Sequence, residues 1–308
     1  MLTNHKTVAF CVLNDWDNLG LFLTDLGISK NRQKNLIANK KYLNKKLFSR
    51  EAVELPIDLI NVNLVSPKYI GPKIEKIEDN KLFLALSKPT KVHSLPLNYS
   101  ESDNILSFIR MDEKNAEIFF INKYSYEKGL LYRLDYETSG LILLAKDELF
   151  YNSFRNKIKK NKYYLAVVQG DIKNDFSYAH HISYFGEKGA IGKVTAEATK
   201  NAHLEGKKIA FDQKNNQSLV LIKLSEGMRH QIRIQLSHEG NPIIGDPIYG
   251  LVKSTRMFLH SFCYEFFYNN KEHQVLDFHF NELEIIFNGD GILKMAHEAL
   301  LSFKSSHF

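Results

Sequence analysis

Short apolar runs of the kind that form β-strands recur through the middle of the chain without alternating regularly with helical segments. Valine, isoleucine, phenylalanine and tyrosine dominate these runs, which predicts strands. A doubly wound parallel sheet needs a helix between successive strands, so the chain is predicted to be α+β, with a mixed, mostly antiparallel sheet and flanking helices. The predicted strands are KLFLALS (81–87), AEIFFINK (116–123), GLILLAK (140–146), YYLAVVQG (163–170) and SLVLIKLS (218–225), and HQIRIQLSHEG (230–240) is predicted to be a helix.

Composition bounds the class of protein. The 308 residues are 44% apolar and 25% charged, as in an ordinary globular protein. The two cysteines, Cys11 and Cys263, are too few for a disulfide scaffold or a zinc site and suit a reducing compartment. The first apolar run meets Asp15 and Asp17 too soon for a signal peptide, and no run approaches the roughly 18 apolar residues of a membrane span. We therefore expect a cytoplasmic protein with no membrane partner.

The net charge of +6 is concentrated at one end of the chain. Residues 1–50 contain nine lysines and arginines against three aspartates, and the remaining 258 residues hold equal numbers of basic and acidic side chains. A basic end on a neutral body is typical of a protein that contacts a polyanion such as RNA. A lysine-rich surface that is merely solvated would give the same count, so both readings stay open here.

Two short helices are predicted in this basic segment, one that ends before Gly27 and one that starts at Ser29 as its N-cap. The pattern resembles the small α-L RNA-binding domain, although that family usually has an arginine in place of the first of the three cations named below. The alternating run PIDLINVNLV (56–65) then predicts a strand, and PKYIGP (67–72) reads as a linker. We therefore predict an RNA-binding domain over residues 1–66 and a second domain over 67–308. The cations that the second helix would offer to phosphates are Lys30, Arg32 and Lys34.

Several chemistries have no motif in this sequence. It contains no phosphate-cradling P-loop, no nucleophile-elbow serine and no His-Glu-x-x-His helix. The glycines of GEKGAIG (186–192) do not follow a strand and enter a helix, so they predict a hairpin connection. The pair His180 and His181 has no nearby cysteine or carboxylate in the sequence and is predicted to be structural or RNA-facing. No metal and no cofactor are predicted.

An arginine and an aspartate, Arg133 and Asp135, stand just before the apolar run from Leu141 to Ala145, with a Thr-Ser-Gly turn between them and that run. A salt-bridged strand end would explain this pattern. Buried charges are costly unless they are paired, and they also concentrate where chemistry is done. The spacing alone does not decide between these two readings.

Four segments that occur in a fixed order bring in a known family. They are YRLDYETSGLILLAK (132–146), NKYYLAVVQG (161–170), EGMRHQIRIQLSHEGNPIIGDPIYG (226–250) and FLHSF (258–262). In this order they resemble the RluA-type pseudouridine synthases, which isomerise uridine within RNA. The resemblance extends from about Lys81 to Phe267. It implies a catalytic domain of the pseudouridine synthase type, with its mixed, mostly antiparallel sheet, over residues 67–308.

The resemblance implies roles for three residues. Asp135 matches the catalytic aspartate, which acts as a nucleophile or a base and must stay ionised while the bound base excludes water. Arg233 matches the arginine that pairs with that aspartate, and we expect its guanidinium to fork onto both carboxylate oxygens of Asp135. Tyr164 matches the tyrosine that offers its ring to the target uracil, with a hydroxyl that could accept the C5 proton. Tyr163 is expected to point the other way along the strand.

Further residues complete the predicted site. Asp246, between a glycine and a proline, is expected to hold a turn rather than to act as a second catalytic carboxylate. Three positions depart from the family pattern: Tyr132 replaces a histidine, Met228 an arginine and Lys91 a glycine. The residues expected to contact RNA or substrate around the site are Arg133, Lys162, Arg229, His230 and Gln231.

The sequence thus predicts a metal-free and cofactor-free isomerase that converts uridine to pseudouridine in a structured RNA. Large-subunit ribosomal RNA is the favoured substrate because the α-L-like domain accompanies enzymes of that class, and transfer RNA is the alternative. A catalytically silent RNA-binding or ribosome-assembly protein of the same fold also stays open. A glycosidase is disfavoured because it needs two working carboxylates. A monomer is the default oligomeric state.

Overall fold

The computed structural model describes residues 7–12, 14–25, 28, 30–37, 40–56, 65, 68–97, 101–122, 125, 127–186, 191–196, 201–225, 227–287 and 291–305. In chain order the elements are β1 (Thr7–Cys11), α1 (Leu19–Asp25), α2 (Lys30–Leu36), α3 (Lys40–Leu43), β2 (Ala52–Pro56), β3 (Glu75–Asp79), β4 (Phe83–Lys88), α5 (Ile105–Met111), η1 (Glu113–Phe119), β5 (Ser139–Ala145), α6 (Glu148–Asn156), β6 (Lys160–Gln169), β7 (Asp175–Phe185), β8 (Ile191–Thr195), β9 (Ala202–Asp212), β10 (Gln217–Leu224), α7 (Gln231–His238), β11 (Leu259–Tyr268), β12 (Lys271–Leu276), α8 (Glu282–Ile286) and α9 (Ile292–Ser305).

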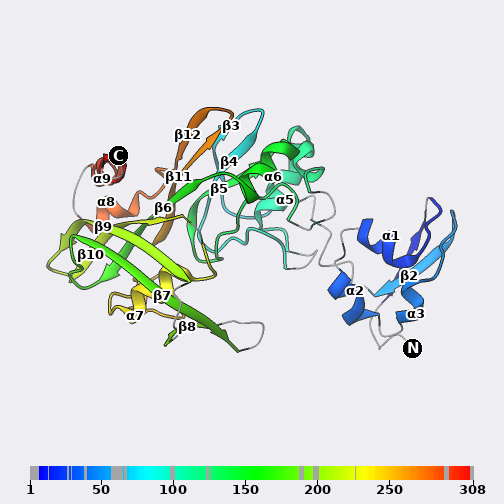
Figure 1. The fold of residues 1–308 in the computed structure, drawn as a ribbon, viewed down its shortest axis with the longest axis horizontal. Coiled ribbons are helices and arrows are strands. Elements are labelled where there is room, and N and C mark those ends of the chain that lie inside the picture. Colours follow the sequence, from blue (N-terminus) through cyan, green and yellow to red (C-terminus); the bar gives the residue numbers. More distant parts are fainter. Residues whose placement is uncertain are drawn as a thin grey trace.

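The N-terminal elements form a small unit with its own core. Strands β1 and β2 pair antiparallel, and helices α1 to α3 lie between them in the sequence (Figure 1). The buried side chains of this core all come from residues 12–55. The side-chain amide of Gln33 joins α2 to α1, because its Nε2 donates to Gly20 O at 3.2 Å and to Ile28 O at 2.8 Å.

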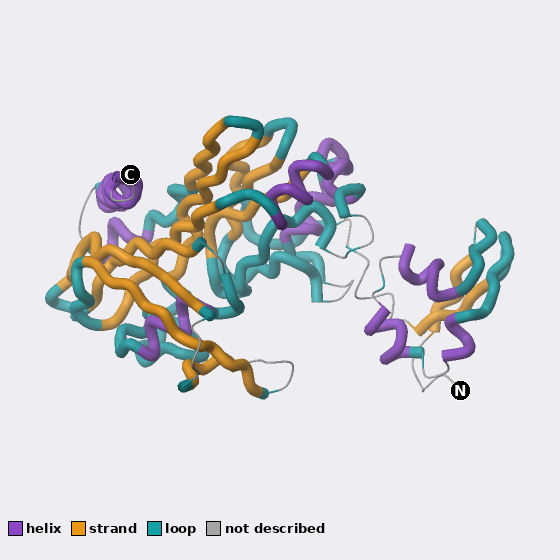
Figure 2. Tube along the Cα trace, in the orientation of Figure 1, coloured by secondary structure: helices purple, strands orange, loops and turns teal. Residues whose placement is uncertain are grey.

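The rest of the described chain is built on one ten-stranded sheet with the order β3-β4-β5-β11-β6-β10-β9-β7-β8, and β12 pairs with β11 (Figures 1 and 2). Among the described strands, β5 and β11 form the one parallel pair, and every other pair is antiparallel. The predicted mixed, mostly antiparallel α+β sheet is therefore confirmed.

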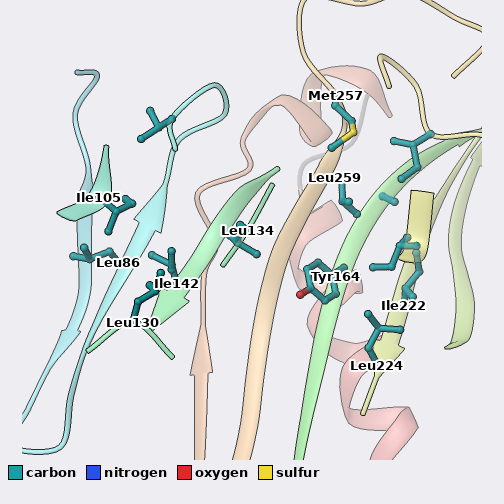
Figure 3. Packing of buried hydrophobic residues seen from close by; sticks show 14 of the residues in the cluster. Leu86, Ile105, Leu130, Leu134, Ile142, Tyr164, Ile222, Leu224, Met257 and Leu259 are labelled. Carbon is teal, nitrogen blue, oxygen red and sulfur yellow. The ribbon is translucent and has the colours of Figure 1, made fainter. Parts of the chain in front are cut away.

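Both faces of the central strands are buried, because successive side chains of a strand point to opposite faces. In β6, Tyr164, Ala166 and Val168 join one apolar cluster, whereas Tyr163 and Leu165 join another on the opposite face. Figure 3 shows Tyr164 among the side chains of the first cluster, beside strand β10. The prediction that Tyr163 and Tyr164 point in opposite directions is confirmed.

Helices cover these apolar faces. Helices α5 and α7 pack on the face that holds Tyr164, through buried side chains that include Ile105, Ile109 and Leu236. On the opposite face, α9 covers the middle of the sheet and α6 covers its β4–β5 side. Among the described residues, no helix has both the length and the apolar character that a membrane crossing requires.

Most sequence-predicted elements are confirmed, and two details are wrong. Residues 116–122 of the predicted strand AEIFFINK are not a strand: they lie in η1 and the turn after it, with Ile118 buried in η1 and Ile121 buried in the turn. Ser139 and Gly140 begin β5 rather than forming the turn, which instead closes from Thr138 N to Asp135 O.

The other turn predictions involve glycines. Strands β7 and β8 pair antiparallel on either side of the predicted hairpin connection, of which residues 187–190 lie outside the described part of the chain. Gly240 follows α7 with a positive φ of 81°. Gly27, Ser29, Gly189 and residues 57–64 of the predicted strand lie outside the described residues.

Gly140 provides a test of the parallel β5–β11 junction. It pairs with Ser261 and has a φ of +108°, and a Cβ there would lie 2.3 Å from Ser261 O. We expect Gly140→Ala to lower the free energy of unfolding by about 3 kcal/mol or more, from backbone strain and overpacking together. Gly186 is the matched control, since its φ is +81° but a Cβ would meet no atom of the described residues within 4 Å. Gly186→Ala should cost only about 1 kcal/mol in urea unfolding, and equal losses for the two variants would contradict this description.

Candidate active site

A pocket of about 100 Å³ lies where the segment before β5 meets strand β6 and the start of α7. It is much smaller than the roughly 300–1,000 Å³ typical of drug-sized ligand sites, so it suits one flat ring rather than a larger ligand. Asp135, Tyr164 and Arg233 all line it, although they come from widely separated parts of the sequence. The structure thus places the three predicted catalytic residues around one pocket.

The segment that carries Asp135 is fixed by hydrogen bonds from the loop that follows β4. Ser94 Oγ donates to Leu134 O at 3.0 Å and accepts from Leu134 N at 3.1 Å. Thr90 Oγ1 donates to Glu137 O at 2.8 Å. The backbone on both sides of Asp135 is therefore tied to the same loop, which limits the motion of its carboxylate.

Lys91 belongs to the same loop and explains one departure from the family pattern. Its φ of 59° lies in the left-handed region that favours glycine. Its backbone N–H donates to Tyr136 O at 2.8 Å, so the unusual conformation aims this donor at the segment that carries Asp135. A lysine at this position therefore keeps the turn at some cost in backbone strain.

Beneath this segment lies a fully buried lysine, Lys88, at the end of β4. Its Nζ donates to three backbone carbonyls, those of Val92 at 2.7 Å, Pro89 at 3.0 Å and Tyr136 at 3.3 Å. Burial lowers the pKa of Lys88 to about 7, against the opposing negative charges of Asp135 and Glu137. Lys88 therefore holds together the loop after β4 and the segment that carries Asp135.

Arg233 is the centre of the site. Its side chain is 1% exposed on α7, and Nη1 donates to Asp135 Oδ2 at 3.0 Å. The fork of the guanidinium is directed elsewhere, because Nε and Nη2 each donate to an oxygen of Asp246 at 2.8 Å. The expectation that Arg233 forks onto Asp135 is therefore wrong. Asp246 is the bidentate partner, and Asp135 receives one hydrogen bond.

Asp246 serves two structural purposes. Its Oδ1 accepts from the backbone N–H of Ile248 at 2.9 Å and of Tyr249 at 3.1 Å, as expected of a turn residue. Burial alone would raise the pKa of Asp246, but the hydrogen bonds and charge of Arg233 reverse this effect and hold the pKa below its usual value. Burial would likewise lower the pKa of Arg233, and the hydrogen bonds and charge of Asp246 together with Asp135 raise it instead. This pair is thus ionised throughout the neutral range.

His230 stands at the start of α7 with a left-handed φ of 55°. Its Nε2 lies 3.7 Å from Asp135 Oδ2, and its Nδ1 lies 3.1 Å from the hydroxyl oxygen of Tyr249. Burial lowers the pKa of His230, and the charge of Asp135 opposes that shift without overcoming it. The imidazole is therefore mostly neutral at pH 7, and Arg233 is the cation that contacts Asp135.

Tyr164 faces the pocket from strand β6 and is almost completely buried. Burial raises the pKa of its phenol far above the neutral range. A phenol that keeps its proton is a poor acceptor for a second one, so the structure favours the stacking role over the predicted proton-acceptor role. Because the ring is fixed by the packed face around it (Figure 3), it offers a rigid surface to a planar base.

The predicted RNA-contacting residues divide into two groups. Arg133, Lys162, His230 and Gln231 line the pocket, whereas Arg229 does not. Gln231 is engaged by the protein itself, since its Nε2 donates to a backbone carbonyl at 2.9 Å and its Oε1 accepts from the N–H of Met228 at 3.0 Å. Arg133 is more than half exposed and lies 3.8 Å from Glu127.

The three predicted N-terminal cations all lie on helix α2. Lys30 and Lys34 are exposed there, and the side chain of Arg32 lies outside the described residues. Helix α2 belongs to the N-terminal unit, and Lys30 and Lys34 do not line the pocket.

Sequence reasoning missed the pairing of Arg233 with Asp246 and the role of Lys88. The first had a readable signal: a guanidinium carries five N–H donors, and a single exposed carboxylate cannot satisfy a buried arginine. The role of Lys88 had no signal beyond the lysine itself, the first of the two in SKPTK (87–91), and a lysine in a loop sequence is usually solvated.

The prediction that His180 has no carboxylate companion is wrong. His238, the last residue of α7, and Glu239 after it lie near His180, and ligand-type atoms of the three residues lie within 4.8 Å of one another. His180 Nε2 lies 2.9 Å from Glu239 Oε1, and the amide of Gln235 donates to Nδ1 at 3.1 Å. Both ring nitrogens therefore have hydrogen-bond partners, which gives the cluster a structural explanation.

Comparison with known proteins agrees with the family resemblance seen in the sequence. Residues 83–238 match the model of the family described as RNA pseudouridylate synthase, a span that contains Asp135, Tyr164 and Arg233. Ribosomal large subunit pseudouridine synthase D of Borreliella burgdorferi is 25% identical over 236 residues, covering 72% of this chain and 70% of that protein. An RNA pseudouridine synthase of Mycoplasma capricolum is 34% identical over 179 residues, which cover 55% of this chain and 56% of that protein.

Similarity extends to a solved structure. Human RNA Pseudouridylate Synthase Domain Containing 1 superposes with a TM-score of 0.52 at 20% identity, covering 67% of this chain and 83% of the human chain. At this level of identity the match supports the fold.

The Arg233–Asp246 pair predicts how stability depends on pH. Because the pKa of Asp246 is lower in the folded protein than in the unfolded chain, its stabilisation is complete above the ordinary aspartate pKa of about 4 and is lost as the pH falls through the folded value. Asp246→Asn should therefore lower the free energy of unfolding by about 3–5 kcal/mol at pH 7, since it leaves a buried guanidinium without its main partner. Urea unfolding should show this difference shrinking as the pH drops below about 4. A pH-independent difference would contradict the assignment.

Proposed function

Because this chain belongs to the RNA pseudouridylate synthase family, we propose that it isomerises particular uridines of a structured RNA to pseudouridine with Asp135 as the reacting carboxylate. The observation that supports this proposal is the placement of Asp135, Arg233 and Tyr164 around one small pocket. The reaction breaks the bond between ribose C1′ and uracil N1, turns the base and joins C1′ to C5. The C5 proton leaves and N1 gains one, so the product is an isomer of the substrate.

Asp135 is arranged to react, because it faces the pocket beside a fixed cation. Its side chain is 29% exposed at the pocket, unlike that of Asp246, which is 1% exposed. Among the described residues, its contacts with Arg233 and His230 both use Oδ2, so Oδ1 keeps its lone pairs for the substrate. A carboxylate held by one fixed cation can attack a carbon or remove a proton as water is excluded.

Arg233 positions the carboxylate of Asp135 and Tyr164 positions the uracil ring, and neither residue reacts. Arg233 is anchored by Asp246, so it presents Nη1 to Asp135 in a fixed direction. Tyr164 supplies a buried aromatic face, on which a uracil ring could stack with roughly 1–3 kcal/mol of stabilisation. The preorganised groups reduce the reorganisation that the reaction would otherwise require.

Large-subunit ribosomal RNA is the substrate that we favour, with transfer RNA as the alternative. The support is the similarity to a relative named ribosomal large subunit pseudouridine synthase D, together with the α-L-like pattern of the N-terminal segment. We assign RNA binding to an N-terminal domain over residues 1–66, in which α2 exposes Lys30 and Lys34, and catalysis to residues 67–308. Val65 already packs in the core of the larger domain, one residue before that boundary.

A catalytically silent RNA-binding protein of the same fold is the second candidate, and the unusual Tyr132 and Met228 favour it. Neither residue disturbs the Asp135–Arg233 contact, which is 3.0 Å long. The two candidates differ in whether pseudouridine forms and whether its formation depends on Asp135.

The deciding experiment uses large-subunit ribosomal RNA from a strain that lacks this protein. With EDTA present, the wild-type chain should form pseudouridine, detected by mass spectrometry of RNA fragments, and Asp135→Asn should reduce the rate by at least about 1,000-fold with RNA affinity retained. Glu137→Gln is the matched control, because Glu137 lies 3.7 Å from the same guanidinium, and it should lose less than about tenfold. Equal pseudouridine formation by Asp135→Asn would refute the catalytic role, and loss of activity on chelation would refute the metal-free reaction.

A further inference from the structure

A large open groove adjoins the pocket, with a volume of about 970 Å³. We call it the α6–β6 groove. One side is formed by residues 155–162, which join the end of α6 to the start of β6, and the other by residues 265–267 of β11 and Glu272 of β12. The mechanism proposed above does not use it.

The α6–β6 groove is strongly basic on one side. Residues 155–162 include five cations, and the carboxylates that line the groove are Glu265 and Glu272. Glu265 is occupied, because it accepts from the hydroxyl of Tyr163 at 2.9 Å and from Gln274 Nε2 at 2.7 Å. The five cations are Arg155, Lys157, Lys159, Lys160 and Lys162.

Two of these cations are well placed for a partner. Lys157 and Lys159 are exposed, and neither forms an ion pair with any residue that the structure describes. Residues 51–308 hold equal numbers of basic and acidic side chains, so their net charge does not reveal this local excess of positive charge. Clustered cations of this kind raise the local concentration of a polyanion and gain affinity when condensed counterions are released.

The groove and the pocket share a rim. Tyr132, Lys162 and Gly227 line both of them. A nucleotide whose base entered the pocket would therefore have its neighbouring phosphates at the mouth of the groove. This continuity favours an RNA strand over an acidic protein segment as the occupant.

Tyr132 also organises the cations at that rim. Lys162 Nζ lies 3.9 Å from the centre of its ring, Lys160 Nζ 5.2 Å and the guanidinium carbon of Arg155 5.7 Å. The negative faces of an aromatic ring attract cations, so Tyr132 gathers three like charges that would otherwise repel one another. A protonated histidine at this position would add a fourth positive charge instead.

We propose that the α6–β6 groove binds the phosphodiester backbone of the single RNA strand next to the target uridine, with Lys157 and Lys159 contacting phosphates and Tyr132 holding Lys162 at the rim. This inference rests on the proposed function only in taking the pocket to be the uridine site. It places part of the RNA affinity in the catalytic domain rather than in the N-terminal cations.

The test measures the affinity of the full-length chain for a fluorescent oligouridylate of about 12 nucleotides over a series of salt concentrations. Lys157→Ala/Lys159→Ala should weaken binding roughly tenfold at moderate salt and make the slope of log affinity against log salt shallower by about 1.4, because each lost phosphate contact removes about 0.7 for single strands. The matched control is Lys173→Ala/Lys214→Ala. Both of these lysines are exposed, and they lie near the opposite end of β6, where Gln169 pairs with Gln217. The control should leave the slope unchanged.

Other outcomes of the same experiment would overturn the proposal. The proposal fails if Lys157→Ala/Lys159→Ala leaves the salt slope unchanged. It also fails if this variant and Lys173→Ala/Lys214→Ala lose equal affinity, because only the net charge would then matter. A loss for Lys30→Ala/Lys34→Ala alone would place the contact on the N-terminal domain. Groove-dependent binding of an oligoglutamate but not of the oligouridylate would assign the groove to a protein.

Tyr132 provides a second readout. Tyr132→Phe keeps the ring and should retain the wild-type salt slope. Tyr132→Leu should weaken oligouridylate binding, because the ammonium of Lys162 loses its contact with an aromatic ring. Identical binding by both variants would refute the organising role. Pseudouridine formation is measured separately: if the groove binds RNA but no pseudouridine forms, the proposed function fails and the groove assignment stands.

Discussion

The buried guanidinium of Arg233 is the interaction on which the site depends. Its 1% exposed side chain would be strongly destabilising alone, because the cost of removing a charge from water must be offset by close partners. Asp246 accepts two hydrogen bonds of 2.8 Å from the guanidinium, and Asp135 accepts a third of 3.0 Å. Since Asp246 satisfies most of the charge, Asp135 can remain partly exposed and still face a fixed cation.

The architecture delivers these groups through unrelated elements. Strand β5 begins just after the Asp135 segment, β6 carries Tyr164, and α7 carries Arg233. The backbone around Asp135 is held by Ser94, in the loop after β4, and by buried Lys88, at the end of β4. Burial lowers the pKa of Lys88 to about 7, whereas its three donated hydrogen bonds use all three N–H groups of the charged form.

Patterns that depend on local periodicity were readable from the sequence. The strands at β4, β5, β6 and β10 follow from short apolar runs that are buried almost continuously, as expected of strands covered on both faces, and the helix α7 also lies where it was predicted. AEIFFINK failed because its high β-propensity was overridden by a capped 3₁₀ turn, in which Asp112 accepts from the backbone of Lys114.

Long-range pairings could be predicted only through the ordered motifs. Those motifs implied the Asp135–Arg233 contact, yet no spacing in the chain reveals that the guanidinium fork belongs to Asp246. The roles of Lys88 and of the basic side of the α6–β6 groove could not be predicted either, because they depend on which strands and loops lie beside these residues in the fold. The sequence therefore indicated Asp135 better than the residues that hold it in place.

The most direct measurement of the central claim is the turnover of Arg233→Lys on a target RNA. An ammonium cannot reproduce the fork to Asp246 and the separate bond to Asp135, so we predict a fall in kcat of roughly 100-fold or more with little change in RNA affinity. Arg256→Lys is the control, since Arg256 is a largely buried arginine that pairs with Glu282 at 2.8 Å outside the pocket lining. It should keep kcat per folded molecule. Near-normal kcat for Arg233→Lys at neutral pH would contradict the account.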